Sequence, residues 1–437
     1  MSATCPVYDY VLIGGGLQSG LIALAIRHHQ PNASMLIVEK DDTLGGNHTW
    51  SFHSTDMVAE SAAWMAPIEQ SQWPSYQVIS GGRERQVQIA YHSIASRHFA
   101  SAVERSFNAS EGRCRLLCGT SVLESNPTTV TTADRSVIHG NCVIDNRGPT
   151  SALRASTGES SFHGGFQKFW GFEVELPIDW PRSTPILMDD RVEQVDGFRF
   201  FYTLPFTPRR ILIEDTRFSN HPCIDRGDCV DKVDAYLKQM TAEKVGLAQC
   251  RIVREESGVL PMPYVGYMPG STQGPASSQG IVAGGYRGGW FHAATGYSFP
   301  LALEFANWVA QTPFDALSAR IQLESSRRRH QARFARFLNR LLFELVKPTN
   351  RYEIFRRFYR VLSTERIARF YGHRFTAMDA ARIVIGVPPS GLRPWNFCRS
   401  FFGSTRRNKP NDAARARVLS AERSQSLHTP VSEKVSS

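Results

Sequence analysis

A glycine-rich turn between two short apolar runs lies near the start of the chain. The first run, residues 8–13, is β-branched and aromatic, as is typical of a buried parallel strand. It leads into GGGLQSG (residues 14–20), after which apolar residues recur at helical spacing as far as Ile26. A second apolar run, residues 35–38, ends in Glu39. This order of strand, turn, helix and strand predicts a βαβ unit that binds a nucleotide.

Each part of the unit has a physical role in holding an adenine dinucleotide. Gly14 permits the tight turn, and Gly16 lets the backbone approach a pyrophosphate at the N-terminus of the helix. Glu39, about twenty residues further on, is placed to accept hydrogen bonds from the ribose hydroxyls. The candidate cofactor-binding residues of this unit are Gly14, Gly15, Gly16, Leu17 and Glu39.

A second glycine pair follows the acid, in the order Gly45, Gly46 and Asn47. Glycines at this place let the chain pass close to the remainder of a dinucleotide. In many FAD proteins such a segment runs beside the ribityl chain or the flavin ring, and nicotinamide-only enzymes usually lack it. The pattern therefore favours FAD over NAD.

Later strands indicate that this nucleotide domain is interrupted by insertions. Apolar runs at 142–149 and 280–286 look like further strands of its sheet, and residues between about 155 and 260 alternate as strands of a second sheet do. We expect an α/β fold in which a Rossmann-type FAD-binding domain carries an inserted β-rich substrate domain. The expected ranges are 1–80, 115–155 and 255–312 for the FAD domain, 81–114 and 156–254 for the substrate domain, 313–403 for a basic helical region, and 404–437 for a disordered tail.

The helical region raises the question of why the chain is basic. Lysine and arginine number 50 against 40 acids, a net charge of +10, and arginines crowd residues 327–374 beside Phe and Leu at helical spacing. A solvated basic face, a nucleic-acid surface and an anionic membrane surface are the alternatives. Nucleic acid is disfavoured because no stacking platform or DNA-reading motif accompanies the charge. Helices at a membrane surface also have cationic faces beside apolar ones. The membrane interpretation gains weight if the substrate is lipophilic.

Several sequence patterns are absent, and their absence narrows the cellular compartment and disfavours several enzyme classes. The eight cysteines are scattered without CxxC or zinc spacing, so we expect free thiols, a reducing compartment and no metal. No secretory signal and no apolar run of membrane-spanning length is seen, so we expect a cytoplasmic chain that meets a membrane from one side. Hydrolase, metalloprotease and nucleotide-triphosphatase motifs are missing as well.

Two acids after an apolar strand are candidates for chemistry. Glu214 and Asp215 follow Ile211-Leu212-Ile213, and because consecutive strand residues face opposite sides, only one of them can enter a given site. A carboxyl group in an apolar pocket has a raised pKa and can act as a general acid. The alternative is a strand-end acid paired with an arginine such as Arg209 or Arg217. For the acid pair at 255–256, which precedes a proline-rich turn, the alternatives are salt bridging and a role in the cofactor domain.

The loop at residues 284–297 is the densest in glycine and aromatic residues. Its glycines let backbone N–H groups approach an anion or a ring edge, and the helix that begins near Pro300 presents a positive end to a negatively charged flavin. A lone histidine such as His292 is more often structural than catalytic. The candidate cofactor contacts in this loop are Gly284, Gly285, Thr295 and Gly296.

Taken together, these segments resemble the bacterial lycopene β-cyclase family over residues 8 to 390. The matching motifs include GGNHTWSFH (45–53), DGFRFFYTLPF (196–206), ILIEDTRFS (211–219), REESGVLPMP (254–263) and GYRGGWFHAATGYSFPLAL (285–303). The resemblance implies a flavoprotein that converts lycopene through γ-carotene to β-carotene. It further implies reduced FAD, with NADPH or NADH as electron source, and no net redox change. By position, the family's essential acid falls on Glu214, with Asp215 beside it.

Two other functions are compatible with the same fold. One is a flavoprotein hydroxylase or monooxygenase of a lipophilic substrate. In such enzymes a Gly-Asp pair usually follows the strand near residue 283. This chain has Gly284-Gly285-Tyr286 there, without an acid, which counts against this function. The other is a membrane-bound carotenoid carrier, which would not need Glu214. The resemblance favours the cyclase, with the membrane surface and the carotenoids as partners and without nucleic acid.

Overall fold

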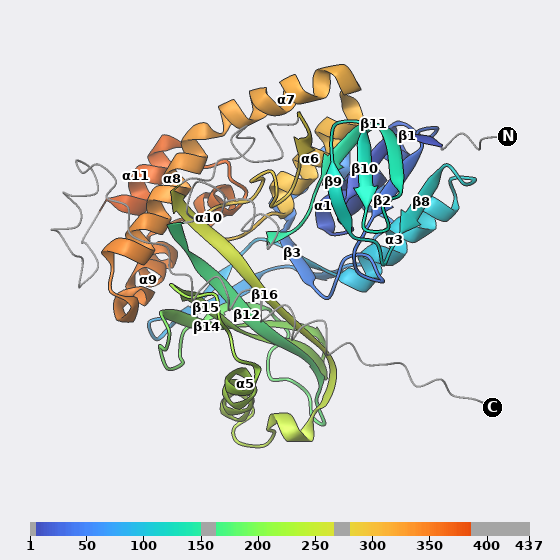
Figure 1. The fold of residues 1–437 in the computed structure, drawn as a ribbon. Coiled ribbons are helices and arrows are strands. Elements are labelled where there is room, and N and C mark those ends of the chain that lie inside the picture. Colours follow the sequence, from blue (N-terminus) through green and yellow to red (C-terminus); the bar gives the residue numbers. More distant parts are fainter. Residues whose placement is uncertain (1–5, 150–162, 266–279, 386–437) are drawn as a thin grey trace, which may run out of the picture.

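The computed structural model describes residues 6–149, 163–265 and 280–385 (Figure 1). Its first sheet has the order β8-β2-β1-β11-β10-β9, with β17 also paired to β11. The strand β1 runs parallel to both β2 and β11, as the βαβ prediction requires, and β9 and β10 add an antiparallel edge. The strands are β1 (Val7–Ile13), β2 (Met35–Val38), β8 (Cys114–Leu117), β9 (Val122–Ser125), β10 (Thr129–Thr132), β11 (Val137–Asp145) and β17 (Val282–Ala283).

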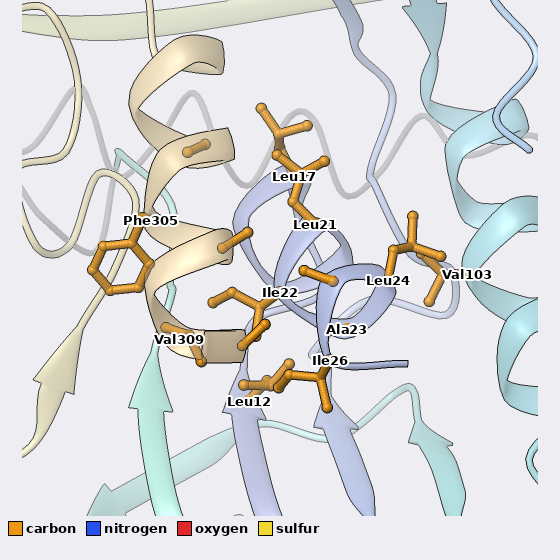
Figure 2. Packing of buried hydrophobic residues seen from close by; sticks show 14 of the residues in the cluster. Leu12, Leu17, Leu21, Ile22, Ala23, Leu24, Ile26, Val103, Phe305 and Val309 are labelled. Atoms are coloured by element: carbon orange, nitrogen blue, oxygen red, sulfur yellow. The ribbon is translucent and has the colours of Figure 1, made fainter. Parts of the chain in front are cut away.

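Three helices pack together on this sheet. The helix α1 (Leu17–His29) lies between α6 (Phe299–Gln311) and α3 (Ser96–Asn108). Figure 2 shows Ile22 and Ile26 of α1 pointing toward the strand residue Leu12, and Val103 of α3 beside Leu24. Gly20 allows the close approach of α3, because a Cβ atom there would lie 2.3 Å from the Phe99 ring.

The second sheet has the order β16-β12-β15-β14-β13-β5-β6 and is covered on both faces. Helix α5 (Arg226–Met240) covers one face, where Ile211 and Ile213 are buried. The C-terminal helices pack near the other face, where Leu212 and Phe218 are buried. The strands are β5 (Tyr76–Ser80), β6 (Arg83–Val87), β12 (His163–Glu175), β13 (Ile186–Asp189), β14 (Phe198–Thr207), β15 (Arg210–Ser219) and β16 (Arg251–Val265).

A small third sheet lies between the two larger ones in Figure 1. Its central strand β7 (Tyr91–Ala95) pairs with β3 (Thr49–His53) and β4 (Ser71–Trp73). Because β3 follows the Gly45-Gly46 pair directly, it carries the chain from the nucleotide domain to the second sheet. Short helices in this part of the chain are η1 (Ser54–Asp56) and α2 (Ala59–Met65), and a third, η2 (Leu247–Gln249), precedes β16.

The basic C-terminal region is helical, as its periodicity predicts. A π-helical turn at Leu341–Leu345 follows α8 and brings Phe343 against β12, where a Cβ atom on Gly165 would lie 2.2 Å from the ring. Among the described residues, no helix is both long and apolar enough to cross a membrane. The elements are α7 (Phe314–Arg327), α8 (Arg329–Arg340), η4 (Leu341–Leu345), η5 (Pro348–Asn350), α9 (Tyr352–Val361), α10 (Thr364–Tyr371) and α11 (Ala377–Val384).

The sheets divide the chain at different residues from those expected. The strand β5 belongs to the second sheet although 1–80 was assigned to the FAD domain, and β16 pairs with β12 from residue 251 to residue 265, beyond the expected border at 254. Conversely, α3 packs on α1 although 81–114 was assigned to the substrate domain. Strand register and amphipathic burial set these borders, and composition does not reveal either. The tail 404–437 and residues 386–403 lie outside the described residues.

Candidate functional site

The glycine turn forms an open cradle at the start of α1. Gly14 has φ +91°, and a Cβ atom on Gly15 would lie 2.5 Å from the Leu44 side chain, so both positions require glycine. A Cβ atom on Gly16 would meet nothing within 4 Å, and no side chain caps the helix that starts at Leu17. Unpaired N–H groups beside open space are the donor set that a pyrophosphate needs.

Glu39 closes the other side of this cradle. Its carboxylate accepts hydrogen bonds from the backbone N–H groups of Gly15 and Asp41. The acid therefore fixes the shape of the turn, and it stands at the end of β2, where the sequence places the ribose contact.

The loop 284–297 meets the glycine turn through one side chain. The Gln18 side chain accepts a hydrogen bond from Gly285 N at 3.2 Å and donates one to Ala302 O at 3.0 Å. A Cβ atom on Gly284 would lie 2.2 Å from Asn146 Oδ1, so the loop lies directly on the end of β11. The structure thus brings Gly284 and Gly285 next to the turn that carries Gly16.

The far end of the same loop reaches the second sheet. Gly296 has φ +68°, and a Cβ atom there would lie 2.8 Å from Leu260 and 3.3 Å from Gln167 Oε1. Thr295 stabilises this end, because its hydroxyl accepts a hydrogen bond from Tyr297 N at 3.3 Å. The loop therefore runs from the nucleotide turn to the sheet face, as an extended dinucleotide would.

The segment that starts with Gly45 and Gly46 contacts both the nucleotide turn and the second sheet. Gly45 N donates to Gly15 O at 2.8 Å, which ties the segment to the nucleotide turn. Asn47 contacts β16, where Arg254 donates to its side-chain oxygen at 3.3 Å. Together these glycines and Asn47 connect the cradle to the second sheet.

Two carboxylates meet over a glycine on that sheet. Gly171 of β12 is the register partner of both Glu214 on β15 and Glu256 on β16. A Cβ atom on Gly171 would lie 3.2 Å from Glu256 Cγ and 3.5 Å from Glu214 Cγ. The missing side chain therefore lets both buried acids lean toward one point on the same face.

The two acids differ in their partners. Glu256 is ion-paired with Arg254 and accepts a hydrogen bond from the Thr49 hydroxyl at 2.7 Å. Glu214 accepts one from the Thr216 hydroxyl at 2.6 Å and forms no ion pair among the described residues. Burial raises the pKa of Glu214 to about 8, and the nearby carboxylate of Glu256 adds to the rise. A carboxyl group with a pKa raised in this way is expected to keep its proton at neutral pH.

Asp215 points to the opposite face of the sheet. Its carboxylate, which is fully buried, pairs with Arg199 at 2.8 Å and with Arg217 at 2.7 Å. The alternative interpretation, an acid paired with an arginine such as Arg217, therefore describes Asp215. Of the two candidate catalytic acids, only Glu214 shares its face with Glu256, and Asp215 has a structural environment.

Hydroxyl and aromatic groups complete the face around Glu214. Tyr202 is its register partner on β14, and the Tyr202 hydroxyl donates to Ser51 Oγ of β3 at 2.7 Å. The Tyr91 hydroxyl lies 3.3 Å from that of Tyr202. Sequence analysis missed these residues and left the role of Glu256 open. The available signal was Gly171, because a glycine inside a strand marks a close approach.

The residues present fit FAD. The loop from Gly284 to Gly296 connects the turn at Gly16 to the second sheet, so a dinucleotide bound at the turn and along the loop would extend toward that sheet. The buried Oε1 atom of Gln167, beside Gly296, has no hydrogen-bond donor among the described residues. The open helix N-terminus at Gly16 and the glycine-rich segments that lead from it to the second sheet suit a flavin dinucleotide.

Solved structures place the fold in a known class. The chain is similar to p-nitrophenol 4-monooxygenase from Pseudomonas putida, with a TM-score of 0.58, 12% identity, and coverage of 84% of this chain and 98% of that one. It is also similar to a probable FAD-dependent monooxygenase from Pseudomonas aeruginosa, with a TM-score of 0.54, 15% identity, and coverage of 80% and 99%. The fold is that of the FAD-dependent monooxygenases.

Sequence comparison identifies the family within this class. Residues 9–394 match the family described as lycopene cyclase protein. Lycopene β-cyclase of Pseudescherichia vulneris is 35% identical over 91% of this chain and 99% of its own length. The Paracoccus sp. enzyme of the same name is 36% identical over 88% and 95%. The chain belongs to the lycopene cyclase family and is an enzyme of that kind.

The contrast between the two neighbouring acids predicts different effects of substitution. Asp215→Asn leaves two buried arginines without a full counter-charge and should lower the free energy of unfolding by about 3–5 kcal/mol. Flavin binding should persist below the unfolding transition. Chemical denaturation followed by circular dichroism measures the change.

A matched control is Asp179→Asn, which removes a surface carboxylate paired with the exposed Arg209. That substitution should cost less than about 1 kcal/mol. Equal stabilities of the two variants would show that Asp215 does not hold the sheet together.

Proposed function

We propose that this chain is a lycopene β-cyclase, which closes the ends of lycopene into β-rings through γ-carotene to give β-carotene. Family membership supports the substrate class, and the protonated Glu214 across Gly171 from Glu256 supports the chemistry. An alkene is a very weak base, so its protonation needs a carboxylic acid that is neutral and desolvated. Glu214 meets both conditions.

The reaction moves one proton and rearranges electrons without oxidation. Glu214 donates its proton to the terminal double bond, and the neighbouring alkene attacks the resulting cation and closes the ring. A proton then leaves an adjacent carbon, so the product has the same formula as the substrate. The pair of Glu214 and Glu256 is the local acceptor for that proton, and the ring face of Tyr202 stabilises positive charge beside it.

The cofactor in this proposal is FAD in its reduced form, with NADPH or NADH as the source of electrons. The turn at Gly14–Leu17 and Glu39 would hold the adenosine and pyrophosphate, and the segments at Gly45–Asn47 and Gly284–Gly296 would hold the remainder. When bound, a reduced anionic flavin supplies negative charge near the developing cation. The N-terminus of α6 favours such a charge, because no side chain caps it.

A membrane surface is the proposed source of this hydrocarbon substrate. Helix α11 exposes Met378, and Ile385 follows its end, with exposed side-chain fractions of 71% and 72%. Arg382 lies exposed on the same helix. Apolar and cationic groups side by side suit the boundary of an anionic bilayer on the cytoplasmic side.

Charge reversal on α11 tests the membrane proposal. Arg382→Glu should weaken co-sedimentation with phosphatidylglycerol vesicles about fivefold or more, because each basic residue near such a surface contributes about 1 kcal/mol. The matched control, Arg115→Glu, lies on the exposed β8 edge far from α11 (Figure 1) and should bind as the unchanged protein does. The proposal fails if both variants bind alike.

Expression in lycopene-accumulating bacteria tests the proposed reaction. The unchanged chain should turn red cells yellow-orange, with β-carotene seen by chromatography. Glu214→Gln cannot donate a proton, so turnover should fall at least about a hundredfold while FAD is retained. Persistence of lycopene in cells that contain flavin-loaded, unsubstituted protein would rule the function out.

Glu255→Gln provides the control for the acid pair. Glu255 faces α5, where it accepts hydrogen bonds from Trp170 at 3.1 Å and Arg226 at 2.8 Å. This variant carries the same chemical change next to Glu256 but on the other side of the sheet. It should therefore retain cyclisation, and an equal loss in Glu214→Gln and Glu255→Gln would point to general destabilisation.

A further inference from the structure

Three glutamates and two arginines form one cluster on the face of the second sheet that carries the acid pair. The acids are Glu173 on β12, Glu214 on β15 and Glu256 on β16, and all three are buried. The cations paired with them are Arg210 on β15 and Arg254 on β16. In the described part of the chain, neither arginine forms an ion pair with Glu214. The cluster therefore has two cations for three carboxyl groups.

Arg254 bridges two of these acids with different atoms of its guanidinium. Its Nε atom lies 2.9 Å from Glu173 Oε2, and its Nη1 atom donates to Glu256 Oε2. Glu173 has a second cation, because Arg210 also pairs with it. For Glu256, Arg254 is the one paired cation among the described residues. The charge of Glu256 therefore depends on Arg254.

The Thr49 hydroxyl joins the two ends of this ion pair. It accepts a hydrogen bond from Arg254 Nη2 at 2.7 Å and donates one to Glu256 Oε2 at 2.7 Å. Arg254 Nη1 also donates to Asn47 Oδ1 at 3.3 Å, so the segment before β3 holds the guanidinium in place. An adjacent cation and a donated hydrogen bond both favour the ionised form of a carboxyl group. These contacts therefore favour Glu256 as the carboxylate.

The charges of the cluster then leave one proton on the third acid. With Glu173 and Glu256 ionised, both arginines are matched, and an ionised Glu214 would add a buried negative charge without a cation. Such a charge is costly, so Glu214 keeps its proton. His48 is another titratable group close to Glu256. Desolvation lowers the pKa of its imidazole, so at pH 7 it adds no compensating positive charge.

We infer that Arg254 assigns the roles of the two facing acids, by keeping Glu256 ionised as the proton acceptor and leaving Glu214 as the proton donor. This inference rests on the proposed cyclisation. Glu214 gives its proton to one carbon of lycopene, and Glu256 takes the proton from the C–H bond that breaks beside the cation. The proton then passes from Glu256 to Glu214 on the other side of Gly171, which restores the starting state. Arg254 acts through Glu256 and is a positioning residue.

Arg254→Met tests this inference by two readouts on the full chain. One cation then faces three acids, so Glu256 should take up a proton. Infrared difference spectroscopy should show a second protonated carboxyl band at pH 7, which is absent from Arg254→Met/Glu256→Gln. Because proton acceptance needs an ionised Glu256, the acidic limb of the pH profile of kcat should move to higher pH by roughly 1–3 units. The profile is measured on lycopene in phospholipid vesicles with FAD reduced by dithionite, and a merely structural role would lower kcat equally at every pH.

Arg226→Met is the matched control. It removes the guanidinium paired with Glu255, which neighbours Glu256 on the same strand but faces α5 and is partly exposed. The number of protonated carboxyl bands and the position of the acidic limb should therefore stay as in the unchanged chain. Equal shifts in Arg254→Met and Arg226→Met would overturn the inference.

The remaining outcomes separate this inference from the proposed function. A single carboxyl band and an unmoved acidic limb in Arg254→Met would overturn the role of Arg254 and leave the cyclase proposal standing. So would loss of the limb in His48→Gln, which would assign the limb to His48. If Arg254→Met does not fold, Thr49→Val removes only the hydroxyl that donates to Glu256 and should move the limb in the same direction, and an unmoved limb there overturns the inference. Failure of the unsubstituted chain to convert lycopene would instead overturn the proposed function, whereas the infrared readout does not depend on turnover.

Discussion

The proposed chemistry depends on two acids that converge over a glycine. Glu214 and Glu256 lie on either side of Gly171, which has no side chain to separate them. Burial also excludes the water that would screen their charges from each other. Arg254 forms ion pairs with Glu256 and Glu173 and none with Glu214, and burial together with the Glu256 carboxylate raises the pKa of Glu214. An acid that stays neutral at physiological pH is the consequence, and such an acid is what alkene protonation requires.

The second sheet places Glu214 and Asp215 on opposite faces. Because side chains alternate along a strand, Glu214 and Asp215 face different environments although they are neighbours. Asp215 pairs with two arginines beside α5, where charges hold the sheet to its helix. The opposite face of the second sheet contacts β3 and the loop at residues 284–297, whose glycines let the backbone come close. One strand thereby carries both a buried ion-pair cluster and the candidate acid.

Much of this arrangement was predictable from local patterns. The βαβ unit follows from the spacing of Gly14, Gly16 and Glu39, and the alternation between residues 155 and 260 predicts the strands of a second sheet. The pairing of Glu214 with Glu256 was not predictable, because it depends on the register of three strands that are distant in the sequence. The domain borders were misplaced for the same reason, since β5 and β16 join the second sheet through long-range pairing.

The protonation of Glu214 is the central claim, and infrared difference spectroscopy measures it most directly. A raised pKa means that the protonated carboxyl band should be present at pH 7 and should disappear as the pH rises through about 8. The band should be absent from Glu214→Gln, and its midpoint should fall in Glu256→Gln, which removes the neighbouring charge. A Glu214 carboxylate already ionised at pH 7 would contradict the account.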